Sequence, residues 1–492
     1  MAIALLIIYT FSLTFIFAYS MMQLHLVINY VRFHRRQIEI APTMTDEELP
    51  FVTVQLPVFN ELYVVERLID TVAQFDYPRE KFEIQVLDDS TDESIELSRN
   101  KVAEWQAKGV NITLNTRTDR TGFKAGALNV GLNTAKGEFI AIFDADFVPG
   151  PDFLRLTIPY FFQGDKIGAV QTRWEHLNKG YSLLTRVQAF ALDAHFTVEQ
   201  QGRNAGGYFI NFNGTAGVWR RACIDDAGGW QSDTLTEDLD LSYRAQLKGW
   251  KFKYLEDVTS PAELPLAMSA IKSQQFRWTK GGAETGRKIL SRIWKSNITL
   301  GQKLHGTAHL TSSLLFLMVL TCSVLSIPVL LIKNAEPAYA KYFMMMSFFL
   351  LSFISLGIFY FYSLYRRYET GRKTLKQLFS MFPIFLAITM GISLHNSIAV
   401  LEGLLGFKSP FIRTPKFNIT GKGKKNDWHA NRYLKRKLSR GTLVEMLLAI
   451  YFLLGTALGI ILEDYGLLPF HVMLTTGFGL VFYYSIKHSR TA

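Results

Sequence analysis

Six long stretches of the chain contain no Asp, Glu, Lys or Arg and are mostly apolar. They are Met1–Val31, Leu304–Ile332, Tyr342–Tyr365, Leu378–Leu401, Met446–Leu462 and Tyr465–Ile486. A helix needs roughly 20 apolar residues to cross the hydrocarbon core of a bilayer, so each stretch is a candidate span. A single stretch of this kind can be a buried core helix. Six of them, five after residue 303, predict a membrane protein.

Basic residues beside these stretches predict which side of the membrane each end faces. The first stretch is too long for the core of a signal peptide and has no small-residue cleavage site before Arg32, so we expect residues 1–32 to form a transmembrane helix. The segment 406–440 carries eleven Lys or Arg and one acid, Asp427, which places it in the cytoplasm. A single full crossing by Leu378–Leu401 would instead put segment 406–440 outside the cell. The stretch also contains Pro383, which suits a broken helix. We therefore expect 378–401 to be a broken, re-entrant or interfacial segment, and expect five crossings and one partial one.

Residues 33–300 show a different pattern, in which short β-rich runs alternate with amphipathic helices. The expected strands are 51–56, 83–87, 111–114 and 139–143, and the expected helices include 64–72 and 125–135. This alternation predicts an α/β domain with a mostly parallel, doubly wound sheet. Ligands of such sheets bind at the carboxyl ends of the strands. No GxGxxG follows the first strand, so a dinucleotide-binding fold is not supported.

Composition narrows the classes of protein further. The chain has 492 residues, only two cysteines and a net charge of +11. Two cysteines exclude a disulfide framework and a zinc ribbon. The positive charge is concentrated beside the apolar stretches and in 406–440, and no basic stripe with exposed aromatics lies on a soluble module. Membrane orientation therefore explains the charge, and we expect no nucleic-acid partner.

Acidic residues gather where the expected strands end. Asp144 and Asp146 follow the strand at 139–143, and two carboxylates at this spacing can hold Mg²⁺ or Mn²⁺ against the phosphates of a nucleotide. Alone, this pattern is more often a solvated turn. Asp88 and Asp89 follow the strand at 83–87, where an acid can simply cap the next helix. Asp238, in Thr236-Glu237-Asp238, has the same capping alternative, or acts as a general base toward a hydroxyl.

A mixed polar and aromatic motif runs from Gln274 to Trp278, with sequence Gln-Gln-Phe-Arg-Trp. An indole stacks on the apolar face of a sugar ring, and the guanidinium of Arg277 matches phosphate oxygens. The alternative is a membrane-proximal helix with an interfacial Trp and a snorkelling Arg.

The order of these motifs resembles a processive family-2 glycosyltransferase of the cellulose-synthase superfamily. The series is Leu56–Glu61, Asp88–Ser90, Phe123–Asn129, Asp144–Asp146, Thr236–Asp238 and Gln274–Trp278. The segments His195–Gln200 and Phe212–Arg220 look closest to the cellulose-synthase-like mannan and glucan synthases. The resemblance covers about residues 50–420.

The resemblance implies a GT-A fold in a cytoplasmic catalytic domain over 33–300, followed by transmembrane and interfacial helices over 301–492. It implies inverting transfer from a nucleotide-diphosphate sugar, with Mg²⁺ or Mn²⁺. The implied residues are Asp238 and Glu237 for catalysis, Asp144 and Asp146 for the metal, Glu61, Asp88, Asp89, Lys124, Asp144 and Arg277 for the nucleotide sugar, and Asn213, Gly214, Thr215, Gln274 and Trp278 for the acceptor. The segment Phe411–Lys416 resembles a gating loop in which Phe411, Thr414 and Lys416 cover the nucleotide. Arg413 departs from that pattern, because an apolar residue is usual there.

We therefore expect an enzyme of the inner or plasma membrane that polymerises a β-glucan or β-mannan from UDP-glucose or GDP-mannose. Its partners would be the growing polysaccharide and the membrane lipids. One alternative is an enzyme that adds a single sugar to a lipid, which could share the fold and the metal site. A channel or transporter with a cytoplasmic binding domain is another, although a pore does not require Asp238 beside an Asp-x-Asp pair.

Overall fold

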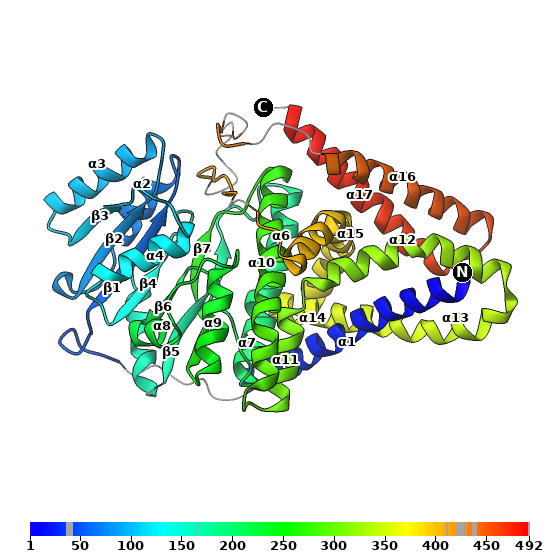
Figure 1. Cartoon of the computed structure of the whole chain (residues 1–492), viewed down its shortest axis with the longest axis horizontal. Coiled ribbons are helices and arrows are strands. Elements are labelled where there is room, and N and C mark those ends of the chain that lie inside the picture. Colours follow the sequence, from blue (N-terminus) through cyan, green and yellow to red (C-terminus); the bar gives the residue numbers. More distant parts are fainter. Residues whose placement is uncertain are drawn as a thin grey trace.

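The computed structural model describes residues 1–35, 43–164, 166–409, 412–419, 428, 431–434 and 440–490. An α/β domain lies at one end and a group of long helices extends from it (Figure 1). The strands are β1 (Val52–Val58), β2 (Phe82–Asp88), β3 (Ile112–Thr116), β4 (Phe139–Ile142), β5 (Ile167–His176), β6 (Gly217–Arg220) and β7 (Lys251–Ala262).

These strands form one seven-stranded sheet in the order β3-β2-β1-β4-β6-β5-β7. The four strands expected from the sequence are confirmed and are parallel to one another. The second half of the sheet differs from the mostly parallel expectation, because β6 runs antiparallel to both β4 and β5. The sheet is therefore mixed, with parallel and antiparallel pairs of strands.

Both faces of the sheet are covered. Alternate residues of β4 enter different cores: Phe139 and Ala141 pack in one cluster with α2, and Ile140 and Ile142 pack in the other with α4 and α9. A strand that is buried on both faces reads as a continuous apolar run, which explains the Phe139–Phe143 pattern. The helices of this domain are α2 (Val65–Val72), α3 (Ser94–Ala107), α4 (Phe123–Thr134), α5 (Phe153–Thr157), α6 (Leu183–Ala194), α7 (Gln200–Ala205), α8 (Arg221–Asp226), α9 (Glu237–Leu247) and α10 (Met268–Lys295).

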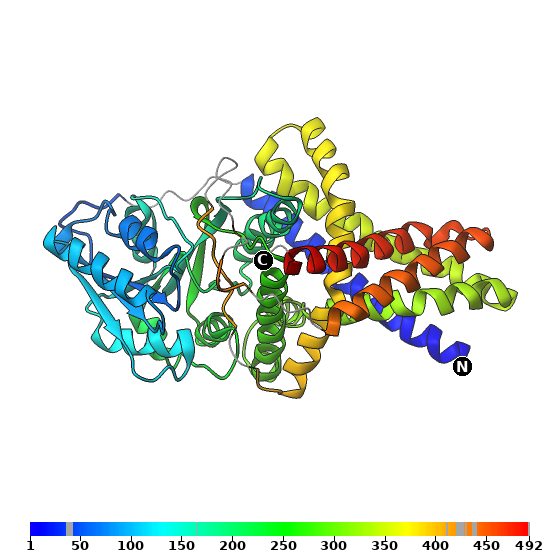
Figure 2. The same ribbon diagram turned by 90° about the horizontal axis from the view of Figure 1, so that it is seen from above.

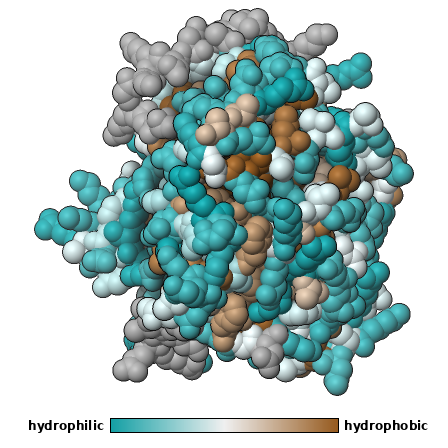
Figure 3. All heavy atoms as spheres, turned by 90° about the vertical axis from the view of Figure 1, so that its left-hand side faces the viewer, coloured by the Kyte–Doolittle hydropathy of each residue, from teal (hydrophilic) through white to brown (hydrophobic). Residues whose placement is uncertain are grey.

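The remaining helices are mostly long and apolar. They are α1 (Ala2–His34), α11 (Leu300–Leu310), α12 (Leu314–Ala335), α13 (Ala340–Met346), α14 (Leu350–Tyr368), α15 (Gly371–Leu405), α16 (Arg440–Ile461) and α17 (Leu468–Arg490). Within the described residues, six helical segments are long and apolar enough to cross a membrane by length and composition. The far face of the α/β domain, in contrast, is mainly hydrophilic (Figure 3).

The segment 378–401 is not broken, which corrects part of the expectation. It lies inside α15, a single helix of 35 residues that contains Pro383. Of the six candidate spans, α15 is the most buried by protein. It runs across the direction of α16 and α17 (Figure 2). This direction and burial favour an interfacial position, so that part of the expectation stands as a prediction.

Helices α15 and α17 approach closely at two glycines. A Cβ built on Gly477 of α17 would lie 1.9 Å from the carbonyl oxygen of Ala387, and one on Gly391 of α15 would lie 2.4 Å from the carbonyl oxygen of Gly477. Neither position has room for a side chain. The backbones of α15 and α17 are therefore in contact at these two glycines.

We predict that Gly477→Ala destabilises this contact, because the added methyl group forces the two backbones apart. Overpacking of a close contact costs about 1–3 kcal/mol. Gly479→Ala is the matched control on the same helix, since a Cβ there meets nothing within 4 Å. Because alanine has a higher helix propensity than glycine, Gly479→Ala should leave stability unchanged or raise it slightly. Thermal unfolding of both variants in one detergent tests this, and equal Tm values would contradict the close approach.

Candidate active site

Asp144 and Asp146 lie directly after β4, at the carboxyl end of the sheet, and each faces a lysine. The Lys124 ammonium, from the first turn of α4, is 2.5 Å from Asp144 Oδ1 and also donates to the carbonyl of Gly214 over 2.8 Å. The Lys416 ammonium is 2.6 Å from Asp146 Oδ2. Burial opposes the charge of Lys124, but Asp144 and Glu237 outweigh it and raise the pKa of Lys124.

The donor set at this pair fits a divalent ion that also binds phosphate. Asp146 is buried and Asp144 is about one-third exposed, so the two carboxylates line one edge of the site. Among the described residues, no group of three or more His, Cys, Asp or Glu could hold a metal unaided. Mg²⁺ is typically bound by one or two carboxylates together with substrate phosphates, and this pair meets that requirement. Asp144 and Asp146 each already have a lysine as a positive partner.

The tripeptide Asn213-Gly214-Thr215 joins the carboxylate pair to Asp238. Thr215 Oγ1 accepts the backbone N–H of Asp144 over 2.8 Å. Gly214 has φ +76°, and a Cβ there would lie 3.2 Å from Asp238 Oδ2, so this position needs glycine for both conformation and space. Asn213 Oδ1 accepts from Asn211 Nδ2 over 2.5 Å. The predicted acceptor and catalytic residues are therefore adjacent.

Asp238 is in the first turn of α9. Burial, followed by the neighbouring Glu237, raises the pKa of Asp238 to about 7, while Lys124 and the backbone amides of Asp238 and Leu239 oppose the rise. The N-cap residue of α9 is Thr236, whose side chain makes no capping hydrogen bond, and Asp238 lies two residues further into the helix. A carboxylate that titrates near neutral pH is suited to accept a proton from a hydroxyl.

Helix α10 brings Arg277 of its polar motif to the same site. Arg277 donates from a terminal nitrogen of its guanidinium to Thr414 Oγ1 over 2.9 Å. Gln274 and Trp278 are four residues apart and lie on one face of α10, and both are partly exposed. Trp278 is thus placed on the helix that leads from the α/β domain toward α11 and the long helices.

The segment 412–419 is docked onto this site by charged contacts. Arg413 forms a forked ion pair with Glu61 (2.9 and 2.5 Å), so the carboxylate predicted to bind the nucleotide sugar contacts this segment. The backbone N–H groups of Phe417 and Asn418 donate to the buried Glu263 over 2.7 and 2.8 Å. No motif in the sequence identifies Glu263. Thr414 and Lys416 contact Arg277 and Asp146 as described above, and Phe411 lies outside the described residues.

Asp88 and Asp89 have different surroundings. Asp88 is 1% exposed, and its oxygens accept from the Ser90 backbone N–H and the Ser98 hydroxyl, so it holds the turn after β2. Asp89 is held by Arg117, and Arg120 lies 3.3 Å from the ring centroid of Phe59. Neither arginine belongs to a recognisable motif, so the sequence alone does not predict these contacts.

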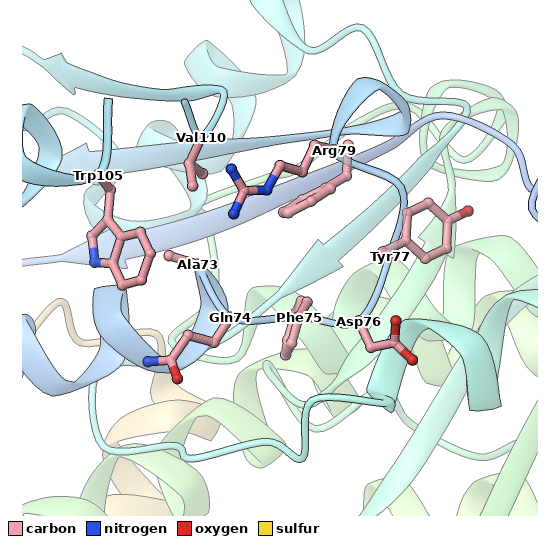
Figure 4. Close-up of a pocket in the computed structure, with 9 residues that line it drawn as sticks. Ala73, Gln74, Phe75, Asp76, Tyr77, Arg79, Trp105 and Val110 are labelled. Atoms are coloured by element: carbon pink, nitrogen blue, oxygen red, sulfur yellow. The ribbon is translucent and has the colours of Figure 1, made fainter. Parts of the chain in front are cut away.

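A separate cavity of about 480 Å³ lies near the amino ends of the strands and contains none of these residues. Trp105, Gln74 and Arg79 surround it (Figure 4). It is at the opposite edge of the sheet from the carboxylates. We therefore assign the candidate active site to the carboxyl ends of the strands.

Comparison with known proteins identifies the domain. Residues 50–281 match the model "Glycosyltransferase like family 2". The chain is 45% identical over 269 residues to glucomannan 4-β-mannosyltransferase 1 of Oryza sativa subsp. japonica, covering 54% of this chain and 52% of that protein. It is 42% identical over 301 residues to glucomannan 4-β-mannosyltransferase 7 of Arabidopsis thaliana, covering 58% and 54%. The chain thus spans about half the length of these curated relatives.

A solved structure shares the fold. The mannosyltransferase PcManGT from Pyrobaculum calidifontis, in complex with GDP-Man and Mn²⁺, aligns with a TM-score of 0.55 and 19% identity, covering 82% of this chain and all of that one. The family match over residues 50–281 is the one that the sequence motifs predicted, and the structural alignment confirms the predicted GT-A fold class.

We predict that Glu61→Gln loosens the segment 412–419, because Arg413 loses the charge that compensates its own. Removing one partner of a buried ion pair costs about 3–5 kcal/mol, and cleavage by a protease follows the population of the opened segment. Limited trypsin digestion, with mass spectrometry of peptides ending at Lys416, should show cleavage at least ~10-fold faster. Glu66→Gln, at an exposed acid five residues away, is the control. Equal rates in the two variants would contradict the docking.

Proposed function

We propose that this protein is an inverting, membrane-embedded hexosyltransferase that extends a β-linked polysaccharide of the mannan or glucomannan type. The observation that carries the proposal is the position of Asp238 beside Gly214, with Lys124, Asp144 and Arg277 gathered at the same strand ends. This arrangement puts a proton acceptor next to a group of cations that match a diphosphate. GDP-mannose is the proposed donor, in preference to UDP-glucose, because the relatives are named mannosyltransferases.

We assign binding of the donor to two carboxylates, which would hold the metal, and to two cations, which would contact the phosphates. Asp144 and Asp146 would hold Mn²⁺ or Mg²⁺, which supplies charge compensation for the departing diphosphate. Lys124 and Arg277 orient the phosphate oxygens. Asp89 and its partner Arg117 lie beyond Lys124 at the end of β2, where the nucleoside would be held.

The acceptor reacts at Asp238. Its carboxylate accepts the proton of one sugar hydroxyl while the hydroxyl oxygen forms a bond to the anomeric carbon of the donor. The bond from that carbon to the diphosphate breaks on the opposite side, which inverts the configuration and gives a β linkage. Asn213, Gln274 and Trp278 hold the terminal sugar, with the indole stacked on its apolar face.

Two features favour a growing polymer over transfer of a single sugar to a lipid. The Gln274 to Trp278 motif lies on α10, which continues directly to α11 and the long helices, so an acceptor held there is already directed toward the membrane region. The relatives are also named as glucomannan enzymes. The protein would lie in the plasma membrane with residues 33–300 in the cytoplasm, in contact with lipids and without a nucleic-acid partner.

We predict that Asp238→Asn lowers polymer formation at least ~100-fold, because general base catalysis typically contributes 10²–10⁴-fold. The assay is incorporation of label from GDP-mannose, with UDP-glucose in parallel, into product that a β-mannanase digests. Calorimetry should show that GDP binding is retained. Asp225→Asn, at an exposed acid on α8, is the control. Normal turnover by Asp238→Asn would refute the base assignment, and a product consisting only of glycolipid would favour the lipid acceptor.

The pKa of Asp238 also predicts a pH dependence. The base must be ionised, and burial raises the pKa to about 7, so activity should rise as the pH increases through that value. We expect kcat/KM to fall about tenfold between about pH 8 and about pH 6. Initial rates at several GDP-mannose concentrations across this range test it. A flat profile over the same interval would show that Asp238 does not titrate as the base.

A further inference from the structure

A cavity of about 420 Å³ lies where the α/β domain meets α14 and α15. The turn 177–181 after β5, one face of α6 and the junction of α14 with α15 form its walls. None of the residues assigned to the donor or the acceptor lines it. The cavity therefore belongs to a different site.

One face of α6 supplies most of a wall. Arg186, Ala189, Phe190 and Asp193 all line the cavity and are spaced i, i+3, i+4 and i+7, which places them on one side of the helix. The two middle residues are apolar and buried. The face thus has a cation at one end, an anion at the other and an apolar centre.

The opposite wall combines apolar residues with one cation. Leu364 and Arg367 lie one helical turn apart on α14, and Met381 comes from α15. Phe190, Leu364 and Met381 belong to one buried apolar cluster. The cavity consequently has an apolar floor and a charged rim.

The rim carries an excess of positive charge: three cations, Lys179, Arg186 and Arg367, against one carboxylate, Asp193. Asp193 already has partners, with His176 at 3.2 Å and Arg367 at 3.5 Å. Burial would raise the pKa of Asp193, but His176, Arg367 and Lys179 together hold it below its usual range, so it stays ionised.

Two of the three cations remain available to a ligand. Arg186 is exposed and forms no ion pair within the described part of the chain, and Lys179 has only the partly exposed Glu175 at 3.6 Å. The position of the cavity along α14 indicates where it lies relative to the membrane. The apolar sequence of α14 ends at Tyr365 and is followed by Arg366 and Arg367, the pattern of a helix leaving the hydrocarbon core. Arg367 lines the cavity, so the cavity lies near the membrane surface.

We propose that this cavity binds an anionic phospholipid, with its phosphate between Arg186 and Lys179 and the start of an acyl chain against Phe190, Leu364 and Met381. Basic pockets at the cytoplasmic ends of membrane helices bind anionic head groups in this way. Free phosphate shares the charge but gains nothing from the apolar floor. This site goes beyond the proposed transferase function and does not depend on it.

Native mass spectrometry of the full-length protein in detergent tests the proposal, with dioctanoyl phosphatidylglycerol, dioctanoyl phosphatidylcholine and inorganic phosphate as probes. The pocket variant is Lys179→Gln with Arg186→Gln. The charge-matched control is Arg372→Gln with Lys373→Gln, two exposed residues near the start of α15 that do not line the cavity. Thermal unfolding establishes that both variants are folded.

Phosphatidylglycerol should bind the wild type more tightly than either other probe. Each basic residue near an anionic head group contributes about 1 kcal/mol, or roughly fivefold, so the pocket variant should bind roughly 25-fold more weakly. The control should differ from the wild type by less than about twofold. Equal losses in both variants would show a general attraction to charge and overturn the proposal. So would inorganic phosphate binding as tightly as the lipid, or an unchanged pocket variant.

Discussion

The crowding of negative charge at one edge of the sheet is the constraint on which the site depends. Asp144 and Asp146 follow β4, Glu237 and Asp238 begin α9, and like charges this close repel one another unless cations intervene. Lys124 and Lys416 pair with Asp144 and Asp146 respectively, whereas burial and the neighbouring Glu237 raise the pKa of Asp238 to about 7 against the opposing effect of Lys124. In the proposed function, Asp144 and Asp146 would hold a divalent ion, which would supply positive charge beside the diphosphate. The base can then stay poised beside an acceptor.

The parts of the fold that follow from local pattern could be predicted from the sequence. Each strand from β1 to β4 is a short β-rich run, and the turn after β4 at Asp144 carries the signal for the site. β6 is only four residues long and follows the turn around Gly214, so its place between β4 and β5 depends on pairing that no local pattern records. The same holds for Arg413, whose partner Glu61 is 352 residues away in the chain. Charge alone does not select that pair among many.

The apolar stretch 378–401 shows that a proline and the charge of a neighbouring segment do not determine a break in a helix. Pro383 and the basic segment 406–440 predict a broken segment, yet α15 is continuous. His395 faces the carbonyl of Lys272 at 3.0 Å, and Asn396 is 1% exposed. These side chains mark the surface that α15 presents to protein rather than to lipid, which is the other way that polar groups are tolerated at membrane depth. Periodicity alone does not distinguish the two causes, because the packing partner α10 lies more than 100 residues earlier.

Buried charges on α10 connect the site to the membrane region. Lys280 is fully buried and pairs with Glu402 of α15 at 3.0 Å, and Lys272 pairs with Glu445 of α16 at 2.7 Å. Buried ion pairs add little net stability, but breaking one leaves an uncompensated charge, so they resist any sliding of α10 against its neighbours. Arg277 and Trp278 lie between these two lysines in sequence. Their positions are therefore fixed relative to the long helices, as an enzyme requires if it builds a chain at a strand edge and directs it into the membrane.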